Sequence, residues 1–181
     1  MSERFGSYDG PMAPKICLRD VQDSDLPIFF RQQRDHEACR MAAFPSRDWE
    51  AFMSHWAKIR DDETTTLKTV VCQGAVAGNV VLWEVSGESR IGYWFGREYW
   101  GQGIAAEALS QFLRQVRTRP LYAHVAKKNL ASIRVLQKCG FTMSGEAAFS
   151  DGDNERGEEF ILTLDLQPKI QSKRNVEIDM V

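Results

Sequence analysis

The chain has 181 residues, a formal net charge of −2 and 43% hydrophobic residues. This apolar content is enough for one compact domain with a real core, and it argues against extended disorder. The nearly neutral charge removes the simplest case for nucleic-acid binding, which needs a basic surplus or a basic stripe. No stretch approaches the roughly 18 apolar residues of a membrane helix, and the segment 1–14 lacks the apolar core of a signal peptide. No nucleic-acid or membrane partner is therefore expected.

The cysteines are scattered and contain no C-x-x-C pair. Their spacing is not typical of a zinc site or a disulfide framework, so we expect no metal and interpret them as reduced thiols of a cytoplasmic protein. We expect a flexible leader at residues 1–14, a folded domain at 15–166 and a C-terminal tail at 167–181. The cysteines are Cys17, Cys39, Cys72 and Cys139.

The first half of the domain predicts one strand, two helices and three more strands. Alternating polarity favours a strand over residues 15–21, and a helix capped near Asp23 continues to about Arg40. Apolar side chains at i, i+3, i+4 and i+7 from Trp49 predict a second helix, which should end near residues 61–62. Short turns then separate three β-type segments, which predicts an antiparallel meander at 67–72, 77–85 and 90–95.

The second half predicts helices alternating with shorter strands. An unbroken 3.6-residue apolar period indicates a helix over 104–118, which Pro120 ends. A strand at 121–125 precedes a short helix over 129–139, closed by Gly140. Two last strands are expected at 141–143 and 159–166, with a loop at 150–157 between them.

The predicted order is β-α-α-β-β-β-α-β-α-β-β. Such an order favours a single-domain α/β (α+β) fold, in which a mixed central sheet carries helices on both faces. The strands at 90–95 and 121–125 should be parallel, because a helix connects them.

A glycine-rich turn joins the strand at 90–95 to the helix that begins at residue 104. Gly101 and Gly103 allow a ligand to approach the backbone closely. Free N–H groups and the helix dipole at the same place favour an anion. A phosphate or diphosphate is therefore the expected ligand, and a tight turn without a ligand is the alternative.

The turn W-G-Q-G-I-A resembles the pyrophosphate loop of the GCN5-related N-acetyltransferase (GNAT) family, whose pattern is Q/R-x-x-G-x-G/A. Trp100 departs from the Gln or Arg of the first position and is similar to the branch that acetylates ribosomal-protein N-termini. The resemblance implies that this loop binds acetyl-CoA and that Trp94 and Phe95 lend backbone groups to its pantetheine arm. The loop positions are Trp100, Gly101, Gln102, Gly103, Ile104 and Ala105.

A second segment, N-x-x-S-x-x-x-L-x-K-x-G-F, runs from Asn129 to Phe141 and resembles another signature of the family. The resemblance implies that Asn129 contacts the coenzyme, with a plain helix cap as the alternative. Many members carry a Tyr where this chain has Leu136, which cannot donate a hydrogen bond. Ser132 is therefore the expected general acid or hydrogen-bond donor to the leaving thiolate, and it also contacts the coenzyme; a surface serine that caps a carbonyl is the alternative.

The implied reaction moves an acetyl group to a primary amine by direct attack on the thioester. A general base must take a proton from the amine, and Glu84 and His124 are the candidates. For each, the alternative is an ordinary strand side chain without a catalytic role. No covalent nucleophile is needed, so Cys139 is expected to be an incidental thiol.

The acceptor is left open between a peptide N-terminus and a small amine, because fold and donor do not choose it. Carboxylates in and after the loop at 150–157 suit a cationic acceptor, although a solvated hairpin loop has the same composition. A homodimer is the family expectation.

Two other functions compete with acetyl transfer. A CoA-binding sensor without turnover would explain the absent Tyr. An NADP-dependent oxidoreductase would explain G-x-G-x-x-A at residues 101–106. Lys127 and Lys128 argue against the latter, because an acidic residue should follow the second strand of a dinucleotide site.

Overall fold

A computed structural model describes residues 14–150 and 156–166 of the chain. The predicted leader, apart from residue 14, and the predicted tail at 167–181 lie outside these residues. Seven strands form one mixed sheet in the order β1-β2-β3-β4-β5-β7-β6. The strands are β1 (Ile16–Arg19), β2 (Thr66–Cys72), β3 (Ala75–Val85), β4 (Glu88–Phe95), β5 (Leu121–Ala126), β6 (Thr142–Ser150) and β7 (Arg156–Leu164).

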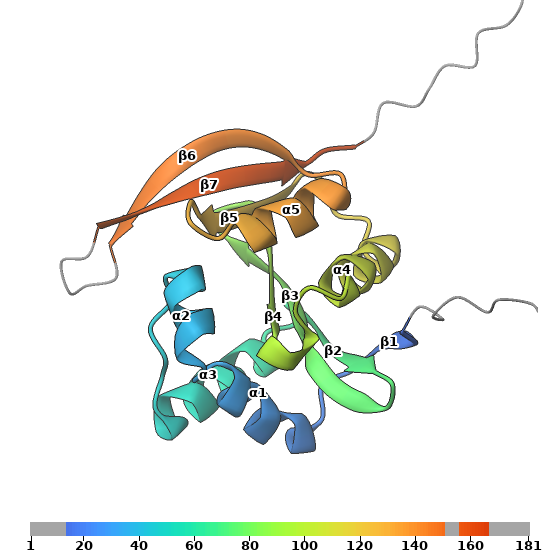
Figure 1. The fold of residues 1–181 in the computed structure, drawn as a ribbon. Coiled ribbons are helices and arrows are strands. Elements are labelled where there is room, and N and C mark those ends of the chain that lie inside the picture. Colours follow the sequence, from blue (N-terminus) through green and yellow to red (C-terminus); the bar gives the residue numbers. More distant parts are fainter. Residues whose placement is uncertain (1–13, 151–155, 167–181) are drawn as a thin grey trace, which may run out of the picture.

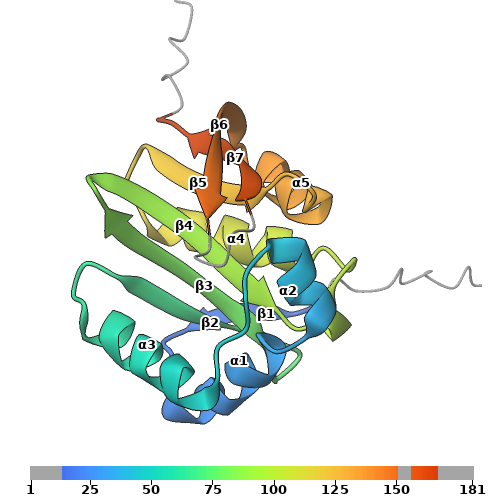
Figure 2. The same cartoon turned by 90° about the vertical axis from the view of Figure 1, so that its left-hand side faces the viewer.

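Helices cover both faces of the sheet, as the element order predicts (Figure 1; Figure 2). Three helices lie on one side, and the two that follow the meander lie on the other. The first group is α1 (Leu26–Gln32), α2 (His36–Ala42) and α3 (Trp49–Asp61); the second is α4 (Ile104–Gln115) and α5 (Leu130–Lys138).

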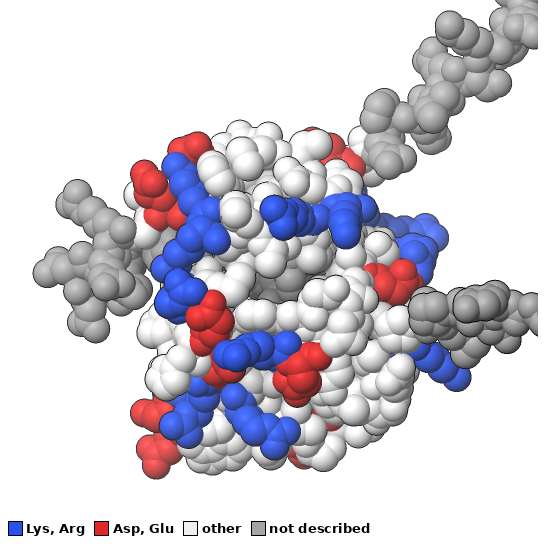
Figure 3. Space-filling view, in the orientation of Figure 1, with Lys and Arg blue, Asp and Glu red and all other residues white. Residues whose placement is uncertain are grey.

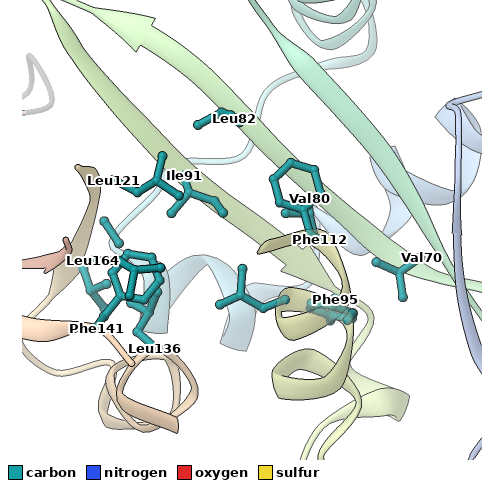
Figure 4. Close-up of a cluster of buried hydrophobic side chains, with 14 of the residues drawn as sticks. Val70, Val80, Leu82, Ile91, Phe95, Phe112, Leu121, Leu136, Phe141 and Leu164 are labelled. Atoms are coloured by element: carbon teal, nitrogen blue, oxygen red, sulfur yellow. The ribbon is translucent and has the colours of Figure 1, made fainter. Parts of the chain in front are cut away.

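The larger core lies between the sheet and the pair α4 and α5. Figure 4 shows Phe112 of α4 packed toward Val80, and Leu136 of α5 grouped with Phe141 and Leu164. These side chains come from positions that the apolar periods of the helices and strands predict to be inward. The burial holds α4 and α5 beside each other on one face of the sheet.

A smaller core lies under α1 and α3 on the opposite face. Phe29 of α1 stacks on Trp56 of α3 with ring centroids 5.0 Å apart, and Phe52 completes the cluster. The stripe that begins at Trp49 therefore packs α3 against α1. Trp49 itself is exposed at the end of the stripe.

The first predicted helix is wrong in its extent, because two helices replace it. After a 3-10 turn at Asp23–Asp25, α1 ends at Gln32 and α2 begins at His36. The carboxylate of Asp35 accepts a hydrogen bond from the N–H of Ala38 and so caps α2. Residues 31–37 contain no apolar side chain and neither Gly nor Pro. The sequence therefore has no apolar period across the break and no breaker residue to mark it.

The last hairpin is longer than predicted. The strand expected at 141–143 continues to Ser150, and β7 begins at Arg156 rather than at residue 159. β6 is the edge strand of the sheet and is mostly exposed between Thr142 and Ala148. Its small and polar residues bury little surface, so the sequence shows no strong alternation of apolar and polar residues that would predict the full strand.

The two parallel strands β4 and β5 separate along their length. Only one pair bridges them, Arg90 with Tyr122. The end of β4 instead stays on β3, where Gly78 pairs with Phe95, and the N–H of Gly96 donates to the carbonyl of Ala77 over 3.0 Å. The predicted parallel arrangement is confirmed, and the divergence of the two strands opens the sheet beside the glycine-rich turn.

Candidate active site

The glycine-rich turn places a row of free N–H groups at the start of α4. Gly101 and Gly103 adopt φ values of 73° and 77°, which favour glycine, and a Cβ on either would meet nothing within 4 Å. Gly103 occupies the cap position of α4, and no side chain caps the helix. Within residues 14–150 and 156–166, the N–H groups of residues 101–105 have no hydrogen-bond acceptor. Such an array, at the positive end of a helix, suits a phosphate group.

A cavity of about 330 Å³ opens against this turn. It continues between β4 and α5, and on its other side it reaches Met41 of α2. The following site residues that the sequence predicted line it: Trp94, Phe95, Trp100, Gly101, Gly103, Ile104, Ala105, Asn129 and Ser132. The divergence of β4 from β5 therefore joins both signatures in one cavity.

Basic side chains stand on the α5 side of the cavity. Figure 3 shows a hollow near the middle of this face, with Lys and Arg side chains over α5 beside it. The cations of α5 are Arg134 and Lys138, and both line the cavity. The charge of these two groups complements an anionic ligand held by the turn.

The second signature brings three polar groups together at the start of α5. The side-chain oxygen of Asn129 accepts a hydrogen bond from the N–H of Ser132 over 3.1 Å, so Asn129 caps the helix and also lines the cavity. The hydroxyl of Ser132 lies 2.7 Å from the hydroxyl of Tyr93 on β4. Burial raises the pKa of the Tyr93 phenol above its ordinary value. Leu136 is 1% exposed and belongs to the core.

Three predicted site residues do not line the cavity. The side chain of Gln102 turns back and donates to the carbonyl of Glu98 over 2.6 Å. Glu84 is exposed near the end of β3. His124 lies on β5, two residues beyond the single bridge with β4.

His124 is held between two carboxylates on the face of the sheet away from α4 and α5. Its Nδ1 lies 2.5 Å from Oε1 of Glu159, and its Nε2 lies 4.0 Å from Oε2 of Glu88. The guanidinium of Arg90 binds Glu88 at 2.9 Å, so Glu88 is already paired. Trp94 points to this same face, where its Nε1 donates to the carbonyl of Gln32. The face that carries His124 therefore also borders the cavity at Trp94.

The thiol of Cys139 lies at the C-terminal end of α5, against α4, and does not line the cavity. It is 3.6 Å from the Ser110 hydroxyl and 3.4 Å from the carbonyl oxygen of Ala106. Burial raises the pKa of this thiol, which disfavours the thiolate that a nucleophile needs. Cys17 is exposed, so the thiols are not uniformly buried.

In the part of the chain that the structure describes, no group of three or more His, Cys, Asp or Glu residues is placed to hold a metal ion. Over the same residues, no helix is both long and apolar enough to cross a bilayer.

The sequence matches the acetyltransferase (GNAT) domain family over residues 15–142. The chain belongs to the GNAT acetyltransferase family. It is an N-acetyltransferase, and acetyl-CoA is its acetyl donor. The free N–H groups of the turn and the cations of α5 fit the phosphates of this donor. The NADP-dependent alternative is therefore wrong, because one donor accounts for both signatures.

Relatives of this GNAT chain include enzymes with different acceptors. It is 28% identical over 146 residues to spermidine N(1)-acetyltransferase of Escherichia coli (strain K12), which covers 75% of this chain and 77% of that enzyme. The structure of spermidine N-acetyltransferase from Vibrio cholerae, in complex with CoA and spermine, has a TM-score of 0.69 and 17% identity, covering 83% of this chain and 95% of the other. The ribosomal-protein-alanine N-acetyltransferase from Brucella melitensis has a TM-score of 0.69 and 19% identity, covering 83% and 99%.

Two parts of this GNAT site were missed from the sequence. Alternation along β4 puts Tyr93 on the same face as Phe95, but nothing local links it to Ser132, 39 positions away. Glu159 is one of the carboxylates after the loop at 150–157, and no local motif pairs it with His124. Alternation in β7 is the one signal that sets it on the same face as His124.

Proposed function

We propose that this N-acetyltransferase acetylates a small cationic primary amine, such as a polyamine. The observation that carries the proposal is the cavity, which has free N–H groups at one end, the Ser132 hydroxyl on its wall and an opening toward the face of His124 and Glu159. A donor and an acceptor approaching from opposite sides of the sheet would meet where β4 and β5 diverge.

Acetyl-CoA would bind at the glycine-rich turn and along α5. The N–H groups of residues 101–105 would hold the diphosphate of acetyl-CoA, and Arg134 and Lys138 would add positive charge. Backbone groups of Trp94 and Phe95, at the end of β4 that leaves β5, would pair with the pantetheine arm. When bound, acetyl-CoA supplies a thioester whose carbonyl carbon gains the new C–N bond while the C–S bond breaks and its electron pair leaves on sulfur.

Ser132 is the proposed hydrogen-bond donor to the leaving sulfur. Its hydroxyl is on the cavity wall, and its only side-chain neighbour among the described hydrogen bonds is Tyr93. A hydrogen bond to a charged group is stronger than one to a neutral group, so this contact would stabilise the thiolate more than the thioester. The released thiolate then takes a proton from water.

His124 is the proposed general base, with Glu159 orienting its ring. A carboxylate on Nδ1 selects the tautomer that leaves Nε2 able to accept a proton. Because His124 does not line the cavity, the amine proton would reach it through one water molecule. Glu84 is exposed near the end of β3 and has no such arrangement.

The negative charge on the face of the sheet that carries His124 supports a cationic acceptor. Glu88 and Glu159 lie on either side of His124 there, and only Glu88 is paired with an arginine. The relatives that are spermidine acetyltransferases support the same class of acceptor. A peptide N-terminus is the second candidate, which the structural likeness to a ribosomal-protein-alanine acetyltransferase favours. A homodimer and a cytoplasmic location stay predictions from the sequence.

An acceptor panel tests the proposal. Thiol release from acetyl-CoA is followed with spermidine, spermine, an alanine-terminated peptide, a neutral amino-acid amide and an aminoglycoside. We expect the highest kcat/KM with a polyamine, and a loss when salt screens the carboxylates. Turnover of the peptide alone would assign the second candidate. Tight CoA binding without thiol release from any amine would support the sensor interpretation.

A further inference from the structure

The hydroxyl groups of Tyr93 and Ser132 form a close pair inside the cavity. Their oxygens are 2.7 Å apart, and the Tyr93 oxygen is 3.2 Å from the carbonyl oxygen of Ser132. Tyr93 comes from β4 and Ser132 from α5, and both residues line the cavity. The ring of Tyr93 is fixed by packing on Phe95, with centroids 6.0 Å apart. The pair is therefore built by two different elements.

Either hydroxyl can donate in this pair, so its direction depends on where the single phenol hydrogen of Tyr93 points. The phenol has one hydrogen, and the distance to the Ser132 hydroxyl is shorter than the distance to the backbone carbonyl. That carbonyl belongs to α5, whose own N–H groups already provide donors for it. When Tyr93 donates to the Ser132 hydroxyl oxygen, the hydrogen of Ser132 is free for a group in the cavity. Two hydroxyls in a chain also polarise each other.

The surroundings of Tyr93 keep its phenol protonated, so that it can donate a hydrogen bond. Burial raises the pKa of its phenol, so the group stays protonated over the range in which the enzyme would work. Leu136, one turn beyond Ser132, is buried in the core and offers no hydroxyl from α5. A hydroxyl from β4 is therefore the available partner for Ser132.

We propose that Tyr93 is a positioning residue, which donates a hydrogen bond to Ser132 and thereby directs the Ser132 hydroxyl toward the leaving sulfur of the donor. This rests on the proposed role of Ser132. A purely structural role, in which the pair only ties β4 to α5, predicts that Tyr93→Phe changes stability or coenzyme affinity and leaves the sulfur contact intact.

Binding calorimetry with CoA and with desulfo-CoA, above pH 9, isolates the sulfur contact without catalysis. Ionisation of the CoA thiol increases in this range, which lies above the pKa of about 8.5 of a cysteine thiol. We expect the protein to prefer CoA by about tenfold, since a hydrogen bond to an ionised group has this strength. Tyr93→Phe and Ser132→Ala should both lose most of this preference and keep their affinity for desulfo-CoA. The matched control is Tyr122→Phe, a half-buried tyrosine of β5 outside the cavity lining, and it should keep the preference.

Steady-state kinetics supply the second measurement. Tyr93→Phe should lower kcat about tenfold with little change in KM for acetyl-CoA, and it should cost less than twofold more in the Ser132→Ala background. The pH profile of Tyr93→Phe should keep its shape, because Tyr93 does not titrate in the working range.

If Ser132→Ala loses the CoA preference and Tyr93→Phe keeps it, the positioning role is overturned. If Ser132→Ala also keeps it, the role of Ser132 in the proposed function fails instead. If Tyr93→Phe lowers kcat about tenfold in the Ser132→Ala background as well, the positioning role is equally overturned.

Discussion

The carbonyl oxygen of Trp94 stands against the Cα of Gly78. A Cβ on Gly78 would lie 2.1 Å from this oxygen and 2.9 Å from the Cα of Phe95. The contact joins β3 to the end of β4, which is the part of β4 that has left β5. The end of β4 thus lies close to the backbone of β3 on one side and is separated from β5 on the other.

Gly78→Ala should destabilise the fold, because the new methyl group meets backbone atoms that cannot rotate away. We expect a loss of about 3 kcal/mol in the free energy of unfolding, measured by urea denaturation. Gly145→Ala is the matched control: this glycine is also in a strand, and its Cβ would have only ordinary contacts with Ile161 at 3.8 Å or more. Equal stability of the two variants would contradict the close approach.

Gly101→Ala and Gly103→Ala should weaken donor binding more than they weaken the fold. Each alanine is strained at positive φ, which costs about 1 kcal/mol, and each methyl group enters the open space above the free N–H groups. We expect KM for acetyl-CoA to rise about tenfold or more. Gly74→Ala is a control with φ of 86°, equal open space and a place in the β2–β3 turn. It should lose similar stability and keep the wild-type KM; the same KM in all three variants would remove the turn from the donor site.

Asp25→Asn tests the ion pair between the buried Asp25, at the start of α1, and the half-buried Arg19. Burial by itself would raise the pKa of Asp25, but hydrogen bonds from Arg19, from the N–H of Gln22 and from Thr69 outweigh it and lower the pKa. The carboxylate therefore stabilises the fold above its unfolded pKa of about 3.9, and this contribution is lost as the pH falls through the lower folded value. We expect the variant to be about 3 kcal/mol less stable at pH 7.

The pH dependence provides the check on Asp25. The stability difference between wild type and Asp25→Asn should be constant above about pH 5 and should shrink in more acidic solution. Asp20→Asn, which removes an exposed carboxylate bound to Lys68, should leave stability nearly unchanged, because solvent screens an exposed ion pair. A difference between wild type and Asp25→Asn that grows on acidification would have the wrong sign for a lowered pKa.

Three glutamine variants separate the candidates for the general base. His124→Gln and Glu159→Gln should each lower kcat by about 10²-fold or more, because they remove the proton acceptor or its orienting partner. Glu84→Gln tests the exposed alternative on β3 in the same assay. Stopped-flow or steady-state thiol release is a suitable measurement. A large loss in Glu84→Gln with normal His124→Gln would reverse the assignment.

Cys139→Ala should keep wild-type kcat, because the thiol lies outside the cavity lining and its raised pKa disfavours a thiolate. Initial rates at varied donor and acceptor concentrations should give intersecting double-reciprocal lines, as direct transfer requires. Parallel lines, together with loss of turnover in Cys139→Ala, would indicate an acetylated enzyme.

Local patterns were sufficient for much of this fold. The apolar period over α4, the glycines before it and the capping Asn129 are properties of neighbouring residues, so the β-α-β unit and its glycine-rich turn could be predicted. The break between α1 and α2 could not, because the polar residues 31–37 include neither Gly nor Pro and only the cap by Asp35 marks it. The length of β6 could not be predicted either. As an edge strand it buries few side chains, so its sequence shows no strong alternation of apolar and polar residues.

The sequence by itself determined the family and the donor, because each signature is a run of adjacent residues with fixed local geometry. Only the tertiary structure decided which side chains of distant segments come together. Tyr93 meets Ser132 across 39 positions, and His124 meets Glu159 across 35. Such contacts depend on how strands and helices are packed, which no local spacing encodes. The opening between β4 and β5 likewise exists only because β4 turns to β3, where the absence of a side chain on Gly78 allows the two backbones to touch.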